Sequence, residues 1–388
     1  MKLLFVHDHI FCTSQNGDIY SPGGFPRELW IKYTSIFDEL TVIGRHSLES
    51  AELSNKHVLS AFSSDSIRFT FVETISTPKK LIKNRKATFS IIEAAVINSD
   101  VVIARLPSEN GLAALKFAEK HKKPYSVEVV GCVWDGLYNY GSMFAKLYAP
   151  IAYIRMRNTI SKAKSVLYVT NSFLQQRYPN SIAPNVVNAS NVNVDINIDT
   201  SHAYKFKNPV VIGMIGNYKT NYKGIDTALS AVLLLKERKV NIELRVLGNG
   251  NPKDYEKFIN DNGLSNNVKF FDPLPSGAPV LEWLGNVDLY IQPSRQEGLP
   301  RSLIEALSCG KICVGSQAGG IPELLEQEFV HKTGSPKSLT EKVQYALNLS
   351  INERQTVLNN NLQRILQYDS KKLNEKRAAF YLNLRSTI

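Results

Sequence analysis

Short apolar runs alternate with stretches of helical period along the whole chain. In the first half, the apolar runs predict strands at Leu3–Val6, Thr41–Ile43, Val101–Ala104, Tyr125–Val130 and Val166–Val169. The stretches between them predict helices, notably over 26–38, 87–98 and 109–121. Such alternation is typical of βα units that surround a parallel sheet with helices.

The second half of the chain repeats this pattern. It predicts strands over 210–216, 243–248, 268–271, 289–293 and 311–315. The Asn- and Ser-rich segment between the halves lacks helical period and indicates a connection between two domains. We therefore predict an α/β chain that divides as follows: a first domain over 1–185, a linker over 186–208, a second domain over 209–365 and a C-terminal helix, 366–388, that packs on the first domain.

Composition narrows the class of protein. With 388 residues, 43% of them hydrophobic, the chain is long enough for two buried cores. No apolar run approaches the roughly 18 to 20 residues that cross a bilayer. The four cysteines do not suggest a disulfide framework, which favours a cytoplasmic location. A net charge of +11 favours an anionic partner, whether nucleotide phosphates, nucleic acid or an acidic membrane surface.

The stretch QEGLPRSLIEALSCGK, residues 296–311, follows the predicted strand LYIQP. Pro300 suits the first turn of a helix, whose free N–H groups would face the carboxyl end of the sheet and favour a phosphate. Glu297 precedes this helix, and Glu305 lies about 7 Å further along it at about 1.5 Å per residue. The spacing allows one carboxylate on each side of a diphosphate, near a sugar and a ribose. The alternative interpretation is that the two glutamates are ordinary surface charges.

A polar loop follows the first strand of the second domain, which ends at Gly216. It carries Lys219 and Lys223 before Gly224 begins a helix. Lysines in this loop can neutralise a diphosphate as point charges. Solvated surface lysines are the alternative interpretation.

Residues 297–325, EGLPRSLIEALSCGKICVGSQAGGIPELL, resemble the signature of glycosyltransferase family 4: two glutamates separated by seven residues and then a Gly-Gly-Ile-Pro-Glu turn. The strand, Lys-Gly and helix over 210–230 and the LGNGN turn follow in the order that this family shows. The resemblance covers most of 208–330. It implies a retaining enzyme of the GT-B fold, in which two Rossmann-like domains face each other across a cleft.

By this resemblance, Glu297 contacts the hydroxyls of the donor sugar and serves catalysis, Glu305 binds the ribose, and Lys223 binds the diphosphate. The backbone amides that assist are those of Arg301, Ser302 and Leu303. Many family members carry an arginine where this chain has Asn217, so we expect Lys219 to supply the missing charge. The stretch 272–277 lies where the family holds the base with main-chain groups, which does not separate UDP from GDP.

Candidate residues of the first domain lie near the ends of predicted strands. Gly23 and Gly24 form a loop whose backbone amides can approach a phosphate or sugar closely, because no Cβ intervenes. The resemblance implies that this loop closes over the donor; a plain flexible connection is the alternative. Many family members have a histidine near Val130 or Gly131, which this chain lacks, so Asp135 is our candidate catalytic base. The acceptor-binding candidates are Arg105 and Glu128. The chain lacks clustered Asp-x-Asp or His ligands, so we expect no metal and no cofactor beyond the nucleotide-sugar donor.

Two basic stretches suggest a membrane contact. Residues 77–89 hold five cations and no acid, and residues 138–164 mix cations with aromatic side chains. Both suit an anionic bilayer, to which each exposed cation adds up to about 1 kcal/mol of binding free energy. We expect a lipid-linked acceptor and peripheral contact with the inner face of the cytoplasmic membrane; a solvated basic face is the alternative.

The leading interpretation is a glycosyltransferase that moves a hexose-type sugar from a nucleotide diphosphate sugar to a saccharide or lipid-linked saccharide, in surface polysaccharide or lipopolysaccharide assembly. Two alternatives stay open. One is a sugar-nucleotide epimerase of the same fold, and the other is a non-catalytic module that binds nucleotide sugars or membranes. Nucleic acid is not an expected partner, because the cations form no known recognition motif.

Overall fold

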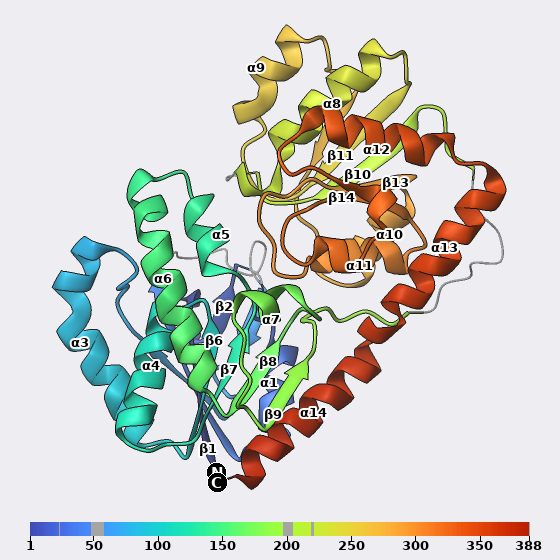
Figure 1. The fold of residues 1–388 in the computed structure, drawn as a ribbon. Coiled ribbons are helices and arrows are strands. Elements are labelled where there is room, and N and C mark those ends of the chain that lie inside the picture. The colour runs from blue at the N-terminus through green and yellow to red at the C-terminus, as the bar shows by residue number, and fades with distance from the viewer. Residues whose placement is uncertain (23, 48–57, 197–204, 219–220, 388) are drawn as a thin grey trace.

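Two sheets, each flanked by helices, make up the computed structural model of this protein (Figure 1). The structure describes residues 1–22, 24–47, 58–196, 205–218 and 221–387. The first sheet is drawn from the first half of the chain and the second sheet from the second half, and a long C-terminal helix runs back along the first. The architecture is an α/β fold with two Rossmann-like domains, as the sequence predicts.

The sheet of the first domain has a parallel body with an antiparallel extension. Its parallel strands run in the order β5-β3-β1-β6-β7-β8-β9, and β2 and β4 continue from β1 in antiparallel pairing. The strands are β1 Lys2–Thr13, β2 Ile19–Ser21, β3 Glu39–Ser47, β4 Val58–Ala61, β5 Ile67–Phe71, β6 Val101–Leu106, β7 Tyr125–Val129, β8 Ser165–Tyr168 and β9 Asn185–Asn188. The described helices of this half are α1 Arg27–Thr34, α3 Pro78–Ile97, α4 Glu109–Lys120, α5 Val133–Tyr138, α6 Met143–Lys162 and α7 Phe173–Arg177.

The sheet of the second domain is parallel throughout, in the order β12-β11-β10-β13-β14-β15. Its strands are β10 Val210–Ile215, β11 Ile242–Leu247, β12 Val268–Phe271, β13 Leu289–Gln292, β14 Ile312–Ser316 and β15 Val330–His331. Its helices are α8 Ile225–Glu237, α9 Lys253–Asp261, α10 Ala278–Gly285, α11 Arg301–Ser308, α12 Pro336–Asn348 and α13 Ile351–Ile365. Counted within the domain, this is the Rossmann order 3-2-1-4-5-6, which reverses direction between β10 and β13.

The central strands of both sheets are buried because helices cover both faces. Every residue of β6, β8, β13 and β14 is buried, which explains the continuous apolar runs in the sequence. No helix in the described part of the chain has both the length and the apolar character of a membrane span.

The C-terminal helix α14, Ser370–Ser386, returns to the first domain and packs against β9 and α1. The short turn η4, Leu366–Tyr368, connects it to α13 of the second domain. The Tyr381 hydroxyl donates a hydrogen bond to Glu128, 2.6 Å away in the core of the first domain. The predicted crossing of the last helix onto the first domain is confirmed.

Candidate active site

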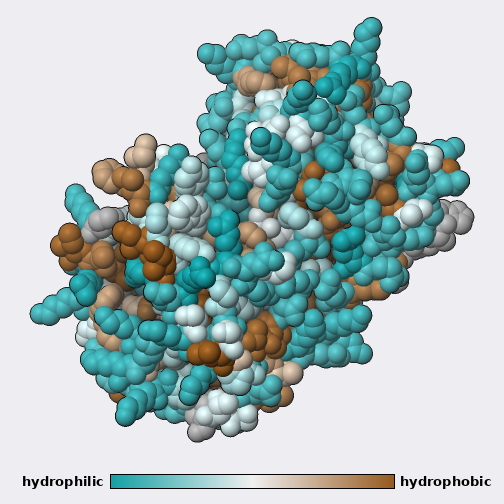
Figure 2. Space-filling view, viewed as in Figure 1, coloured by the Kyte–Doolittle hydropathy of each residue, from teal (hydrophilic) through white to brown (hydrophobic). Residues whose placement is uncertain are grey.

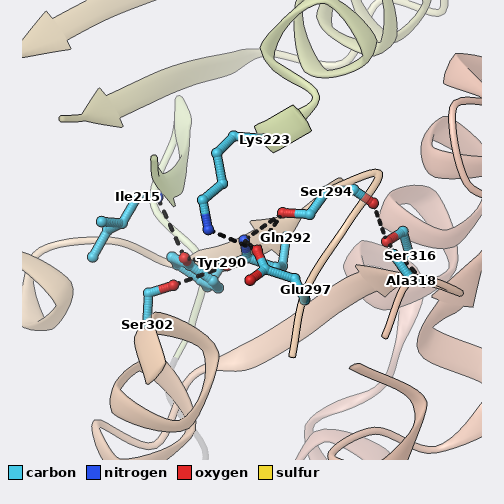
Figure 3. Close-up of polar contacts among 9 residues, drawn as sticks. All are labelled: Ile215, Lys223, Tyr290, Gln292, Ser294, Glu297, Ser302, Ser316 and Ala318. Carbon is cyan, nitrogen blue, oxygen red and sulfur yellow. Dashed lines mark hydrogen bonds and ion pairs between the residues drawn. The ribbon is translucent and has the colours of Figure 1, made fainter. Parts of the chain in front are cut away.

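Glu297 lies in the loop that connects β13 to α11, at the carboxyl edge of the second sheet. One oxygen of its carboxylate, Oε1, accepts hydrogen bonds from Lys223 Nζ at 2.7 Å, Ser294 Oγ at 2.7 Å and Gln292 Nε2 at 3.1 Å (Figure 3). The side chain of Glu297 is only 10% exposed and that of Lys223 only 17%. The structure therefore brings two predicted donor-site residues into a direct, largely buried ion pair.

A second layer of hydrogen bonds holds this pair in place. The Tyr290 hydroxyl donates to Gln292 Oε1 at 2.7 Å and accepts from the backbone N–H of Ile215 at 3.3 Å. Ser302, on α11, donates to the same oxygen of Gln292 at 3.0 Å. Burial raises the pKa of Tyr290, so its hydroxyl keeps the proton that it donates. The orientation of Glu297 is thus fixed from β10, β13 and α11 together.

Lys223 stays charged in this setting. Burial by itself lowers the pKa of its ammonium group, but the charge and hydrogen bond of Glu297 outweigh burial and raise that pKa above its ordinary value. Lys223 lies in η1, Asn221–Lys223, just after the strand β10 and beside the point where the strand order reverses. A fixed positive charge therefore lies where open α/β sheets bind their ligands.

The helix α11 presents the other predicted groups. Its N-cap is Pro300, whose side chain carries no acceptor for the first N–H groups of the helix. The side chain of Leu303 is fully buried, so that residue can offer a ligand only its backbone, whereas Arg301 is exposed. The carboxylate of Glu305 makes no hydrogen bond or ion pair with any described residue. Burial raises the pKa of Glu305, and the positive charge of Arg301 partly opposes that rise.

The loop that carries Glu297 contacts the first domain. A Cβ at Gly298 would lie 2.2 Å from the carbonyl oxygen of Val130, which follows β7. On its other side the loop meets the Gly-Gly turn: Gly320 donates to the carbonyl of Gly298 at 2.7 Å. Gly319 has φ +58°, and a Cβ there would lie 2.1 Å from the carbonyl oxygen of Glu297. Only glycine fits these approaches, which place the site at the junction of the two domains.

Asp135 lies on α5, next to this junction. The Asn139 side chain, on the residue that ends α5, donates to the carbonyl of Arg295 at 3.4 Å, so the end of the helix touches the loop of the second domain. The Asp135 carboxylate lies 3.8 Å from Arg177 of the first domain. Burial raises the pKa of Asp135, and the charge of Arg177 acts against that rise. Its use as the catalytic base stays a prediction.

The prediction that Arg105 and Glu128 bind the acceptor needs correction. Both side chains are buried, with 4% and 0% of the residue exposed. Glu128 accepts from Arg105 at 2.8 Å, from Tyr33 at 2.7 Å and from Tyr381 at 2.6 Å. Arg105 also lies over the rings of Phe5 and Phe25, with 5.2 and 5.1 Å to the ring centroids. The pair belongs to the core, where an acceptor has no access to it.

The structure does not test the assignment of three predicted donor-binding residues, Gly23, Gly24 and Lys219. Gly23 and Lys219 lie outside the described residues. Gly24 has φ +91°, and among the described residues no atom lies within 4 Å of the position that a Cβ would take. Contacts of these three residues with a donor stay a prediction.

The sequence interpretation missed Tyr290, Gln292 and Ser294. The signal was present, because Tyr290 and Gln292 are two residues apart on a strand and so project to the same face. Gln292 is a polar residue at the end of an otherwise apolar strand, and this exception to the pattern could have marked it as a site residue. In the described part of the chain, no group of three or more His, Cys, Asp or Glu side chains could hold a metal ion.

Two Rossmann-like domains that meet at a junction are the GT-B architecture of glycosyltransferases, and the comparisons with known proteins agree. The family "Glycosyl transferases group 1" matches residues 197–364. Protein CapJ of Staphylococcus aureus is 30% identical to this chain in an alignment of 396 positions, which covers 100% of this chain and 97% of CapJ. The chain belongs to the glycosyl transferases group 1 family.

Two further similarities are more limited. The N,N'-diacetylbacillosaminyl-diphospho-undecaprenol alpha-1,3-N-acetylgalactosaminyltransferase of Campylobacter jejuni is 32% identical over 28% of this chain and 29% of its own. The crystal structure of Anabaena Alr3699/HepE in complex with UDP-glucose has a TM-score of 0.66 over 100% of both chains, with 16% identity. The latter similarity concerns the fold alone.

Proposed function

We propose that this protein is a retaining transferase of glycosyltransferase family 4, which moves a hexose-type sugar from a nucleotide diphosphate sugar to a saccharide or lipid-linked saccharide in surface polysaccharide or lipopolysaccharide assembly. The observation that carries the proposal is the Glu297 carboxylate, held by Lys223 where the strand order reverses and where the first domain meets the second. The Campylobacter relative, whose name states a lipid-diphosphate acceptor, supports the choice of acceptor.

Each group at the site would bind a different part of the donor. The Lys223 ammonium and the free N–H groups at the start of α11 would neutralise the diphosphate. Glu297 would accept hydrogen bonds from hydroxyls of the transferred sugar, and Glu305 from those of the ribose. Asp135, on the first-domain side of the junction, is the proposed catalytic base. Contact between the two domains would exclude water and so limit hydrolysis of the donor. We propose that no metal takes part.

A pocket in the first domain replaces Arg105 and Glu128 as the proposed acceptor site. It encloses about 560 Å³ at the carboxyl ends of β3 and β5, beside α3. Its lining combines two cations, Arg45 and Lys80, with the apolar side chains of Ile10, Phe71 and Ile91, and it also includes His46 and one acid, Glu73. Such a lining suits an anionic group that is joined to an apolar one, as in a lipid-linked diphosphate.

The transferase proposal predicts that one nucleotide sugar of a UDP- and GDP-sugar panel raises the melting temperature. A donor present at 100 times its Kd stabilises the folded state by about 2.7 kcal/mol. With that donor, release of nucleoside diphosphate is expected to require an added saccharide or lipid-linked acceptor. Conversion of the donor into another nucleotide sugar without acceptor would favour the epimerase, and binding without turnover would favour the non-catalytic module.

Peripheral contact with an anionic membrane is a further part of the proposal, and α6 supports it. One face of this helix packs on the domain through Ala149, Ala152, Met156 and Ile160. A different face leaves large apolar side chains in solvent at helical spacing: Met143, Phe144, Leu147, Ile151 and Ile154. Figure 2 has hydrophobic surface on the side of the first domain where Figure 1 draws α6 and α3. Exposed cations accompany it, namely Lys146 and Arg157 on α6 and Lys79, Lys80, Lys83 and Lys86 on α3.

Replacing Phe144 and Leu147 together by serine is expected to weaken binding to anionic liposomes at low salt by about tenfold or more. These side chains are 83% and 69% exposed, so the folded protein does not depend on them. Each would contribute about 1.5–3 kcal/mol when fully buried in the bilayer. Sedimentation with anionic and with zwitterionic liposomes measures the effect. Leu382→Ser is the matched control, because this side chain is 52% exposed on α14, away from α6. Equal binding by all three proteins, or none by the parent, would refute the membrane contact.

A further inference from the structure

Glu323 of the second domain reaches across to the first domain and binds the start of one of its helices. Its Oε1 accepts from the backbone N–H of Ser172 at 3.0 Å, from the Ser172 hydroxyl at 3.0 Å and from the N–H of Phe173 at 2.6 Å. Its Oε2 accepts from the N–H of Asn171 at 2.7 Å. These N–H groups open α7, so a carboxylate from one domain caps a helix of the other.

Asn171, just before α7, also forms hydrogen bonds with the segment that connects the two domains. Its side-chain amide donates to the Tyr368 hydroxyl at 2.8 Å and to Gln367 Oε1 at 3.1 Å. Both partners lie in η4, where the chain leaves the second domain to form α14 on the first. Burial and the nearby charge of Glu323 raise the pKa of Tyr368, which keeps its hydroxyl protonated. The first domain, the second domain and the crossing segment therefore meet within one hydrogen-bonded group.

The same turn also contacts the loop of Glu297. Glu323 ends η2, Ile321–Glu323, which directly follows Gly319 and Gly320. Gly320 is hydrogen-bonded to the carbonyl of Gly298, and the N–H of Glu323 donates back to the carbonyl of Gly320 at 3.1 Å. A short stretch of backbone, residues 320–323, and the hydrogen bond from Gly320 to Gly298 thus connect the carboxylate that caps α7 to the loop that carries the donor-site glutamate.

We propose that Glu323 is a positioning residue that fixes the orientation of the two domains and thereby holds the first domain over the Glu297 site. The inference rests on the proposed function, because only a reaction between partners held by different domains needs that orientation. A carboxylate suits the task since it accepts four hydrogen bonds from one short segment of the other domain. Its contacts are with the first domain, so Glu323 would act on transfer and not on donor affinity.

The test compares Glu323→Ala with the parent protein in three measurements. The kcat for acceptor-dependent transfer is expected to fall tenfold or more, because the domains lose a fixed orientation. The donor Kd is expected to stay within twofold. Small-angle X-ray scattering is expected to give a larger radius of gyration. Glu328→Ala is the matched control, since Glu328 is an exposed glutamate of the same domain, in η3, Gln327–Phe329, and it should change none of the three.

Ser172→Ala removes one of the four hydrogen bonds and serves if Glu323→Ala does not fold; a smaller fall in kcat is expected with an unchanged donor Kd. An unchanged kcat in Glu323→Ala, or a loss of donor affinity with unchanged scattering, would overturn the proposal. Failure of the proposed function looks different, because the parent would then lack acceptor-dependent transfer while the scattering of the variants still reported the contact between the domains.

Discussion

Replacing Glu297 by glutamine is expected to lower the kcat of sugar transfer by about 10²–10³-fold, the loss that follows removal of a pre-positioned charged or polar group at a reacting centre. Glutamine keeps the size of the side chain but removes the negative charge. One of its two terminal groups becomes a donor, whereas Glu297 now accepts from Lys223, Gln292 and Ser294. Acceptor-dependent release of nucleoside diphosphate at saturating donor measures the change.

Glu305→Gln provides the comparison for this variant. The Glu305 carboxylate has no hydrogen-bond or ion-pair partner among the described residues, so its replacement leaves no buried protein group unpaired. A ribose contact is remote from the transferred sugar, and its loss is expected to raise the KM of the donor more than it lowers kcat. Circular dichroism and thermal melting control for folding in both variants. Turnover of Glu297→Gln at the level of the parent protein, with an intact fold, would contradict the assignment of Glu297.

The parts of the fold that sequence could predict are those with strong local patterns. Residues 289–293 predict a strand found at Leu289–Gln292, and Pro300 and Gly310 bracket a helix found at Arg301–Ser308. The start of α3 was missed. Residues 77–86 are too basic to have a clear apolar period, yet Thr77 caps the helix through the N–H of Lys80 and Pro78 follows it. That cap and proline were the available signal.

The candidate site depended on contacts that no local pattern encodes. Lys223 and Glu297 were both predicted, but their direct pairing depends on β10 and β13 being neighbours, which joins residues 74 positions apart. The same limit explains the error over Arg105 and Glu128. Polar residues near strand ends suggested a lined cleft, but β6 and β7 pair so that Arg105 lies opposite Glu128. The two charges therefore neutralise each other inside the sheet, and α14 closes over them through Tyr381.

Replacing Glu128 by alanine is expected to lower the free energy of unfolding by about 3 to 5 kcal/mol, because it leaves the charge of Arg105 buried without its partner. The hydroxyls of Tyr33 and Tyr381 would lose their acceptor as well. Urea unfolding of the parent and the variant measures the difference. The double variant Arg105→Met with Glu128→Leu is the sharper control, since a buried ion pair replaced by apolar groups often costs little. A single variant within about 1 kcal/mol of the parent would contradict a buried, charged pair.

The ionisation of Glu128 also makes the stability of the folded protein depend on pH. Burial by itself raises the pKa of this carboxyl, but the charges of Arg105 and Arg377 and the two tyrosine hydroxyls outweigh burial and lower it from 4.5 to about 2. A lowered pKa in the folded state means that the unfolded chain binds the proton first as the pH falls. The stabilisation is therefore complete above pH 4.5 and is lost as the pH falls towards 2. In unfolding measurements down this range, the parent should lose stability more steeply than the double variant, whose pair no longer titrates; parallel curves would show that Glu128 is not the group responsible.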